Sequence, residues 1–534
     1  MGCYVIAVGG TGNKILESLV YAACADVFGG VSHLDMLSVD VDASCGNTTR
    51  AKRAAECYQN VREALETGAP PHRCFHTAVN VRQWDMNLSR RAASVEKMAQ
   101  NHSRDRLLAR TLFTPAEARL EYSEGFRGHP DLGVLFFADL LSSLEKRRQS
   151  GQPDELNAML DRMEADMQNG REVRVLLCGS IFGGTGASGI PAISKYLRSR
   201  FSGDLFTLGG LLMLPYYSVP RADVDESREI AVSSDTFLDK ARTALQYYGM
   251  EGMIRDGEQD ENGVFDALYL LGLPPEGFVT TRRYSTGSQS QENDAHMLEW
   301  LASRCIAAFF RTGFRGAEQH HMDCYYYQLH TPSFCWQSFD QEEKAYRRGY
   351  GSLLKAAALF FAECYPTLKS CISLDSRQSA RVNYCAPYFA RRPAAEREKL
   401  EELLQTLYRF LNFYANWMIQ IVRTLPPILC QPTEEGRLPQ NELLDANLLE
   451  ELLVLLTQYG LKPEERSRAE KDQAAERLQR ELHRLVIRRT PDRQTAAKII
   501  AGLGGGQRLG TGAEGAVCSF LAALLRCAGE EEDQ

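Results

Sequence analysis

Short apolar runs alternate with longer segments whose apolar residues recur at helical spacing over the first part of the chain. Buried strands are predicted in the segments "CYVIAV", "LDMLSVDVD", "EVRVLLCGS", "LFTLGGLLMLPYY" and "GVFDALYLLGLP". Amphipathic helices are expected between them, among them "ILESLVYAACADVF" and "IPAISKYLRSRF". Strands that alternate with helices in this way are typical of a parallel, doubly wound α/β sheet, which is the fold class that we predict.

The pattern departs from this alternation in two regions. Residues 48–120 are polar and mostly helical in pattern. After residue 312 an aromatic, strand-like stretch (YYYQLHTPSFCWQSF) precedes long helical patterns. They are "LLKAAALFFAECY", "LEELLQTLYRFLNFYANWMIQIVRTL", "NLLEELLVLLTQYG" and "AAERLQRELHRLVIRR". We therefore predict an N-terminal α/β domain over residues 1–312 and a mostly helical C-terminal region over residues 313–534. The late segment "AGLGGGQRLGTGAEG" follows no buried strand, so we interpret it as a loop or hinge.

Composition narrows the class of protein. The chain has 534 residues and a net charge of −8, which gives no general attraction to nucleic acid or anionic membranes. No apolar segment approaches the roughly 18 residues needed to span a bilayer. The 15 cysteines are scattered without a CxxC pair, and the adjacent histidines of "HHMD" lack further ligands at helical spacing. We expect a cytoplasmic protein with reduced thiols, no nucleic-acid partner and no metal site of its own.

Three unusual loops are predicted at the carboxyl ends of strands, where ligands bind in open α/β sheets. They are "AVGGTGNK", "GFRGHPDLG" and "FGGTGASG". Glycine-rich turns before a helix leave backbone N–H groups free to face an anion, and the helix dipole adds to this attraction. The first loop is not a Walker A motif, because Lys14 follows too soon and no Ser or Thr comes after it. Two or more such loops brought together could hold a polyphosphate.

The order and the amino-acid sequences of these loops resemble those of the tubulin/FtsZ family. The segment 182–188 (FGGTGAS) is similar to the family's GGGTG signature, residues 9–13 (GGTGN) to its first loop, and residues 128–133 (GHPDLG) to its third. The resemblance covers about residues 1–312 and is strongest to poorly characterised bacterial tubulin-like proteins. It implies a GTP or GDP ligand with Mg²⁺, head-to-tail homo-oligomers or filaments, and hydrolysis that depends on an acidic loop from a neighbouring subunit.

This resemblance and the loop chemistry together give a set of expected nucleotide-binding residues. They are Gly9, Gly10, Thr11, Gly12, Asn13, Asp40, Asp42, Gly128, Pro130, Gly133, Gly183, Gly184, Thr185, Gly186, Ala187, Ser188 and Asn293. Asp40 and Asp42 could reach ribose or hydrated Mg²⁺ or form a solvated strand end. Thr185 and Asn293 could contact the ligand or instead cap their helices. The glycines could serve only to pack helices closely on the sheet.

Two departures from the family pattern bear on activity. Phe182 and Ser188 replace the first and last glycines of the signature. In place of a clear acidic loop, the segment "RTGFRGAEQHHMD" offers only Glu318 and Asp323, of which Asp323 is the predicted catalytic acid. Nucleotide binding is therefore better supported than GTP hydrolysis. Two alternatives remain: a non-hydrolysing or nucleotide-free scaffold that binds protein partners through its C-terminal helices, and a Rossmann-type NAD enzyme suggested by the first glycine loop and the acid after the second strand.

Overall fold

The structure is a computed structural model of the 534-residue chain. The residues that it describes are 1–42, 45–66, 74–86, 94–99, 103–122, 125–218, 234–253, 263–280, 293–311, 323–325, 346–360, 386–389, 392–424 and 512–529.

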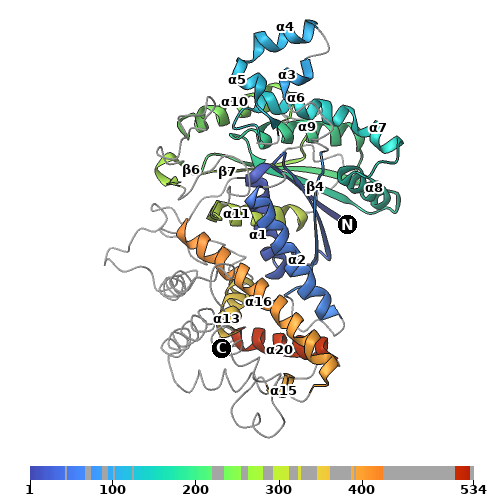
Figure 1. Ribbon diagram of the computed structural model, residues 1–534, viewed down its shortest axis with the longest axis vertical. Helices are drawn as coiled ribbons and strands as arrows, with labels where there is room; N and C mark the ends of the chain where they lie inside the picture. The colour runs from blue at the N-terminus through green and yellow to red at the C-terminus, as the bar shows by residue number, and fades with distance from the viewer. Residues whose placement is uncertain are drawn as a thin grey trace.

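A seven-stranded parallel sheet with the order β3-β2-β1-β4-β5-β7-β9 forms the centre of the molecule (Figure 1). Strands β1, β4 and β5 are almost wholly buried, because helices cover both faces of the sheet. The predicted parallel, doubly wound sheet is confirmed. The strands are β1 (Gly2–Val8), β2 (His33–Val39), β3 (Ala78–Gln83), β4 (Val173–Ser180), β5 (Phe206–Met213), β7 (Ala267–Leu271) and β9 (Asp323–Tyr325), beside a separate pair, β6 (Tyr217–Ser218) and β8 (Val279–Thr280).

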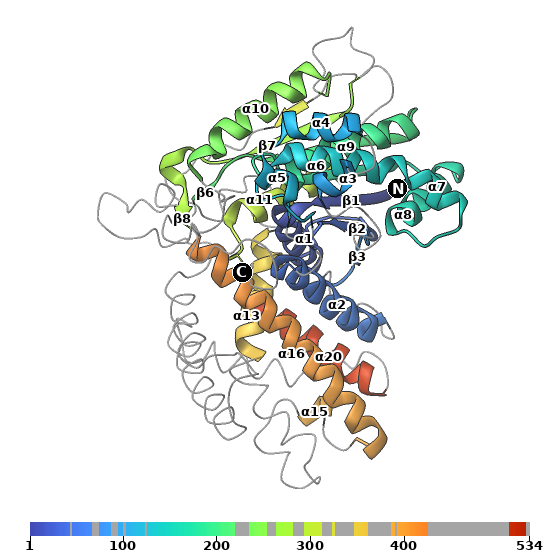
Figure 2. The ribbon, with the colours of Figure 1, turned by 45° about the horizontal axis from the view of Figure 1, so that its top comes forward.

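Helices pack on both faces of this sheet (Figures 1 and 2). One face carries α1 (Gly9–Cys24), α2 (Gly46–Glu66) and α11 (Met297–Arg311). The other face carries α6 (Pro130–Ser142), α7 (Leu144–Gln149), α8 (Glu155–Gln168), α9 (Thr185–Arg200) and α10 (Phe237–Met250). Helices α3 (Val95–Met98), α4 (Ser103–Leu112) and α5 (Pro115–Arg119) project beyond this second layer, and 3₁₀ turns cover Ser234–Thr236 and Pro275–Gly277.

Beyond β9, the C-terminal region is helical where the structure describes it. It contains a π-helical turn (Arg347–Gly351), α13 (Ser352–Leu359), α15 (Ala386–Phe389), α16 (Ala394–Arg423) and α20 (Gly512–Gly529). Helix α16 packs against α2, and the ring of Tyr21 in α1 lies 5.4 Å from that of Tyr414 and 4.8 Å from that of Trp417. The helices predicted at residues 447–460 and 474–489 lie outside the described residues.

Local structure departs from the sequence predictions in four places. Strand β3 lies in the region that was expected to be helical, and it pairs with β2 as an edge strand of the sheet. The third loop is shorter than predicted, because α6 already begins at Pro130. Helix α20 begins at Gly512, inside the segment expected to be a loop. Strand β9 joins the sheet although it lies beyond the predicted domain boundary at residue 312, and that boundary stays a prediction.

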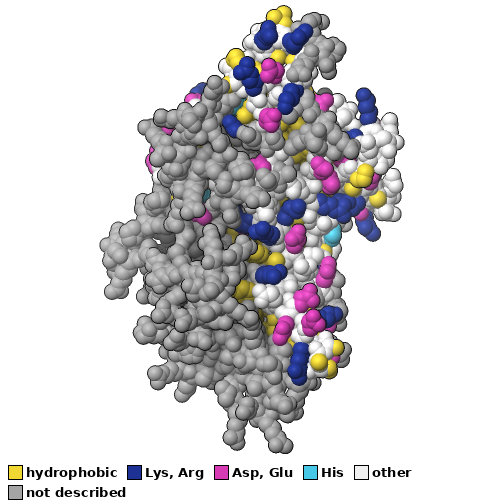
Figure 3. Space-filling view, viewed as in Figure 1, with side chains coloured by type: hydrophobic (Ala, Val, Ile, Leu, Met, Phe, Trp, Pro, Cys, Tyr) yellow, Lys and Arg dark blue, Asp and Glu magenta, His cyan; other side chains and the backbone are white. Residues whose placement is uncertain are grey.

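The described surface is mixed in charge on the face that Figure 3 shows. Basic and acidic side chains are interspersed over α2, α8 and the projecting helices α3–α5. Three leucines of α4 are exposed there, namely Leu107, Leu108 and Leu112. Within the described part of the chain, no helix combines the length and the apolar character that a membrane span requires.

Candidate functional site

The strand order changes direction between β1 and β4. From β1 the chain continues to β2 and β3 on one side, and from β4 it continues to β5 and β7 on the other. The ends of the two strands are neighbours, since Val8 pairs with Gly179. Helix α1 begins directly after β1, and α9 begins shortly after β4. Ligands of doubly wound sheets bind at such a switch point. The glycine turn after β1 (residues 9–13) and the glycine turn after β4 (residues 182–188, the signature turn) therefore lie where a ligand is expected.

These two glycine turns are in contact. Gly9 has a φ of +78°, and a Cβ atom placed on it would lie 3.3 Å from the backbone nitrogen of Gly186 and 3.3 Å from the Cβ of Thr185. Gly12 packs against the sheet itself, because a Cβ there would lie 2.9 Å from the carbonyl oxygen of Cys178. Gly9 therefore permits the two turns to meet, whereas Gly12 permits α1 to approach the strands closely.

The third loop lies against the signature turn. A Cβ atom on Gly184 would lie 2.7 Å from the Cβ of Phe126 and 3.2 Å from the backbone nitrogen of Gly128. A Cβ on Gly133, in the first turn of α6, would overlap the hydroxyl of Ser188. All three loops predicted from the sequence are thus brought together at one edge of the sheet, and Pro130 occupies the first position of α6.

The helices that begin at this edge lack side-chain caps. Neither the N-cap of α1, Val8, nor that of α9, Gly184, makes a capping hydrogen bond through its side chain, and neither helix has an acid in its first turn. By contrast, Ser94, Thr114 and Asp154 cap α3, α5 and α8. Uncapped first turns leave backbone N–H groups without intrahelical acceptors, and two converging helix dipoles favour an anion between them.

Burial divides the predicted residues of these turns into two groups. Those that are partly exposed, and so accessible to a ligand, are Gly10, Thr11, Gly183, Thr185 and Ala187 of the turns after β1 and β4, and Pro130 of the third loop. We call the five residues of the turns after β1 and β4 the rim. The buried residues are Gly9, Gly12, Asn13, Gly128, Gly133, Gly184, Gly186 and Ser188. Thr185 is the first residue of α9 and not its N-cap, so the alternative that it caps the helix does not hold.

Two predicted polar residues are engaged inside the protein. Asn13 donates from Nδ2 to the Thr48 hydroxyl at 2.7 Å and accepts from the Ser38 hydroxyl at 2.6 Å, which ties α1 to β2 and α2. Ser188 donates its hydroxyl to the carbonyl of Gly184 at 2.8 Å. Both side chains are buried, so they support the loops from behind and do not line the rim.

Asp40 and Asp42 follow β2 at the same edge of the sheet, and both are buried. The backbone N–H of Asp42 donates to Oδ1 of Asp40 at 3.3 Å. Burial raises the pKa of Asp40 to about 7. A nearby cation favours the ionised form of a carboxyl group whose pKa is raised by burial. Asp40 and Asp42 could therefore bind the water molecules of a hydrated Mg²⁺.

Asn293 lies four residues before α11 begins at Met297, so it does not cap that helix. Its backbone N–H donates to Oδ1 of Asn47 at 3.0 Å, and its carbonyl accepts from Arg50 at 2.9 Å. Among the described residues, Oδ1 of Asn293 is buried without a hydrogen-bond partner. Asn47 in turn lies beside Gly10 of the rim, with its Nδ2 3.6 Å from the position of a Gly10 Cβ. Asn293 is thus linked to the rim through Asn47.

Phe182 does not obstruct the rim. Its side chain is buried, and its ring packs against those of Tyr217 at 5.8 Å and Phe237 at 4.8 Å. The aromatic residue at the first signature position therefore anchors the turn to the β6 and α10 side of the molecule.

Sequence reasoning missed a buried polar cluster behind the first loop. Lys14 of α1 forms an ion pair with Glu299 of α11, and the same carboxylate accepts from the Tyr216 hydroxyl at 2.6 Å. The other Glu299 oxygen accepts from the backbone N–H of His296 at 2.7 Å. Burial, with a smaller contribution from Lys14, holds the pKa of His296 well below its usual range. The available signal was a lysine directly before the predicted helix "ILESLVYAACADVF".

A second buried ion pair joins α1 to α2. Arg50 of α2 donates to the carboxylate of Glu17 at 2.7 Å, and it also holds the carbonyl of Asn293. Burial raises the pKa of Glu17, although Arg50 opposes the shift. These pairs fix α1, α2 and the segment before α11 relative to one another, and so they position the rim and Asn293.

Asp323 lies at the opposite edge of the sheet. It is the first residue of β9 and pairs with Ala267, the first residue of β7, at the amino ends of the strands. Strands rise about 3.3 Å per residue, so it is far from the rim of its own chain. Asp323 could act on a nucleotide only if a second chain presented its rim to this edge.

Comparison with known proteins gives weak similarities only. No family model and no curated protein match the chain. Among solved structures, a GTPγS-bound protofilament of CetZ2 from Haloferax volcanii aligns at 13% identity and a TM-score of 0.28, covering 58% of each chain. CetZ from Methanosaeta thermophila aligns at 15% identity and a TM-score of 0.24, covering 58% of this chain and 52% of its own. The chain thus spans little more than half the length of these neighbours. Similarities this weak carry no weight for function, and the fold class rests on the strand order.

Proposed function

We propose that this chain is a tubulin-like protein that binds GTP or GDP at the rim formed by the turns after β1 and β4. The observation that carries the proposal is the convergence of two helix N-termini, at Val8 and Gly184, that lack side-chain caps at the switch point of the sheet. A polyphosphate supplies the acceptors that these first turns need. The resemblance of the three loops to the tubulin/FtsZ family supports a guanine nucleotide.

The remaining parts of a nucleotide would find partners around the rim. Thr185 offers its hydroxyl to a phosphate oxygen from the first position of α9. Asp40 and Asp42 would hold the waters of Mg²⁺, which keeps several waters when it binds phosphates. Asn293 offers a buried side-chain oxygen without a partner to the base, and its hydrogen bond to Asn47 orients it.

Hydrolysis and assembly form a further part of the proposal. Backbone amides of the rim and Mg²⁺ would stabilise charge on the γ-phosphate, while an acid orients water. We place Asp323 in that role, acting on the nucleotide of a neighbouring chain stacked head to tail, because it lies at the edge of the sheet opposite the rim. Turnover should then rise with protein concentration.

Two other functions have an observation in their favour. The distance of Asp323 from the rim within one chain favours a scaffold that binds nucleotide without hydrolysing it. The strand order and the acid that follows β2 favour a Rossmann-type NAD enzyme. The contact of the third loop with the signature turn, through Gly184 and Gly128, favours a triphosphate over NAD.

The test begins with the ligand carried by freshly purified protein, released by denaturation and identified by mass spectrometry. GTP or GDP supports the proposal, and NAD overturns it. If the protein is purified empty, calorimetric titration with GTP, ATP and NAD decides, and tighter binding of ATP or NAD than of GTP contradicts the proposal. GTP turnover and light scattering measured over a concentration series then separate an assembling GTPase, in which both rise together, from a scaffold with bound but unspent nucleotide.

A further inference from the structure

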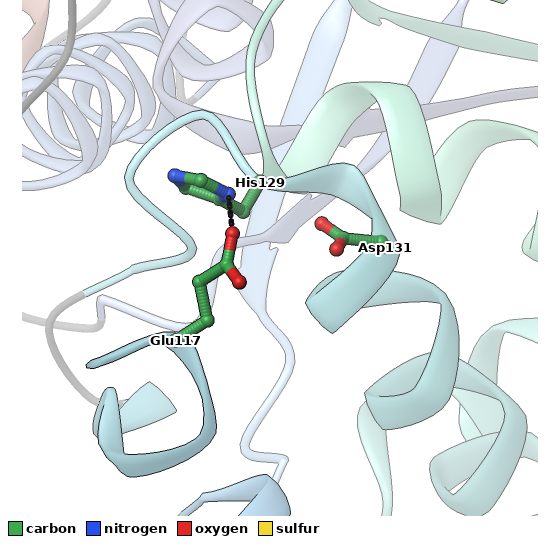
Figure 4. A group of neighbouring side chains, drawn as sticks. All are labelled: Glu117, His129 and Asp131. Atoms are coloured by element: carbon green, nitrogen blue, oxygen red, sulfur yellow. Dashed lines mark ion pairs between the residues drawn. The ribbon is translucent and has the colours of Figure 1, made fainter. Parts of the chain in front are cut away.

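Three potential metal ligands gather at the third loop, outside the rim. Glu117 of α5, His129 before α6 and Asp131 in the first turn of α6 each offer one ligand atom, and these atoms all lie within 4.8 Å of one another (Figure 4). Nδ1 of His129 lies 3.2 Å from Oε1 of Glu117. His129 and Glu117 are partly buried and Asp131 is exposed, so the group is open to solvent on one side.

The structure around Glu117 fixes the orientation of its carboxylate. Its second oxygen, Oε2, accepts from the backbone N–H of Thr114 at 2.7 Å and from the Thr114 hydroxyl at 2.8 Å, in a capping box that begins α5. The other oxygen is left to face His129, as Figure 4 shows. These hydrogen bonds, that of the backbone above all, hold the pKa of Glu117 below its usual range, so the group is ionised at neutral pH. Support of a ligand by surrounding hydrogen bonds is typical of metal centres.

Lys240, a cation beside this group, forms its hydrogen bond elsewhere. Lys240 of α10 donates to the carbonyl of Gly128 at 3.0 Å, and burial lowers its pKa despite the attraction of Asp131. Within the described residues, the carboxylate of Asp131 makes neither a hydrogen bond nor an ion pair. It is therefore free to serve as a ligand.

We propose that Glu117, His129 and Asp131 bind one divalent first-row transition metal ion, with Zn²⁺ as the best fit. One imidazole and two carboxylates form a donor set that suits Zn²⁺ and its neighbours, whereas Mg²⁺ prefers oxygen ligands alone. Binding replaces the contact between His129 and Glu117 by one bond from each side chain to the ion, and it leaves further positions for water. The site joins α5 to the start of α6 and so fixes the third loop. It does not depend on a bound nucleotide.

The test is calorimetric titration of the full chain with Zn²⁺, without nucleotide and with a non-thiol reductant. Glu117→Gln keeps the capping box, since glutamine serves in it as well as glutamate, and His129→Asn places a good N-cap residue before α6. Both variants should therefore fold. We expect each to bind one Zn²⁺ fewer than the parent chain, and Asp131→Asn to weaken that site at least about tenfold.

His33→Asn is the matched control, because His33 also lies beside a carboxylate, that of Asp35 at 3.8 Å, but belongs to no three-ligand group among the described residues. The control should bind as many Zn²⁺ ions as the parent. The proposal is overturned if the Glu117 and His129 variants bind the same number of ions with the same affinity as the parent, or if His33→Asn loses the same ion. Binding to the cysteines is common to all variants and cancels in the comparison.

Discussion

Gly9 and Gly186 come from turns that are far apart in the sequence, yet a single added Cβ on Gly9 would lie 3.3 Å from the backbone nitrogen of Gly186. The contact holds the starts of α1 and α9 side by side. It leaves little space for any side chain at position 9, and the φ of +78° there also disfavours one. The relative position of the two uncapped helix N-termini therefore depends on this glycine.

The Gly9→Ala variant should lose nucleotide affinity by at least about tenfold, because the added methyl group separates the two turns that must face the same phosphates. Gly170→Ala is the control: Gly170 also has a positive φ, +69°, but nothing lies within 4 Å of its position. Calorimetric titration with GTP measures the affinity of both. Equal affinity in the two variants would show that the contact has no role in binding.

Thr185 supplies the second prediction. Replacement by valine should weaken GTP binding by about 1 kcal/mol, the net value of one hydrogen bond to its hydroxyl, and Thr185→Ser should restore it. Thermal unfolding of the nucleotide-free protein should change little, because the side chain does not cap α9. If valine instead lowers the stability and leaves the affinity unchanged, Thr185 has a structural role.

The buried ion pair of Lys14 and Glu299 should contribute more to the free energy of unfolding than an exposed ion pair does. Lys14→Met leaves a fully buried carboxylate without its cation, so we expect a loss of about 3 kcal/mol or more in the free energy of unfolding. Adding Glu299→Gln should recover part of this loss. The exposed pair of Lys195 and Glu251 is the control, and Lys195→Met should cost no more than about 1 kcal/mol. Urea unfolding measures the parent chain and the three variants, and equal losses of stability for the two lysine variants would contradict the expectation.

Asp40 should make stability depend on pH. The pKa of Asp40 in the folded state, about 7, lies above the ordinary value of 3.8. Its contribution to the free energy of unfolding is therefore complete below pH 3.8 and is lost as the pH rises through about 7. Asp40→Asn removes this loss. The stability of the variant relative to the parent chain should therefore rise between these two pH values and level off above them, with a total change of at most about 4 kcal/mol. Urea unfolding over this range checks the sign, and a relative stability that is constant or falls with pH would contradict it.

Much of the fold could be predicted from the sequence because its signals are local. Apolar runs bounded by glycine turns predicted β1, β4 and β5, and the three loops were placed correctly at the carboxyl edge. Strand β3 was missed, since "AVNVRQ" is short, only partly apolar and surrounded by polar helical sequence. The start of α6 at Pro130 could have been predicted, because proline is favoured at the first position of a helix.

The candidate site was less accessible to sequence reasoning, because contacts between distant segments decide which residues face a ligand. Asn13 and Ser188 carry polar groups in the right motifs, but their partners, Thr48 and Gly184, turn them inward. The pairing of Lys14 with Glu299 joins two helices almost three hundred residues apart, and no local pattern predicts it. The same holds for Glu117 and His129, whose proximity depends on how α5 folds back toward the third loop.

The central claim is that the first turns of α1 and α9 bind the phosphates of a guanine nucleotide. A crystal structure of the protein soaked with millimolar GTPγS tests it most directly. We predict density for the triphosphate against the backbone amides of Gly10, Thr11 and Thr185. An empty rim at that concentration, or a nucleotide bound elsewhere on the molecule, would contradict the account.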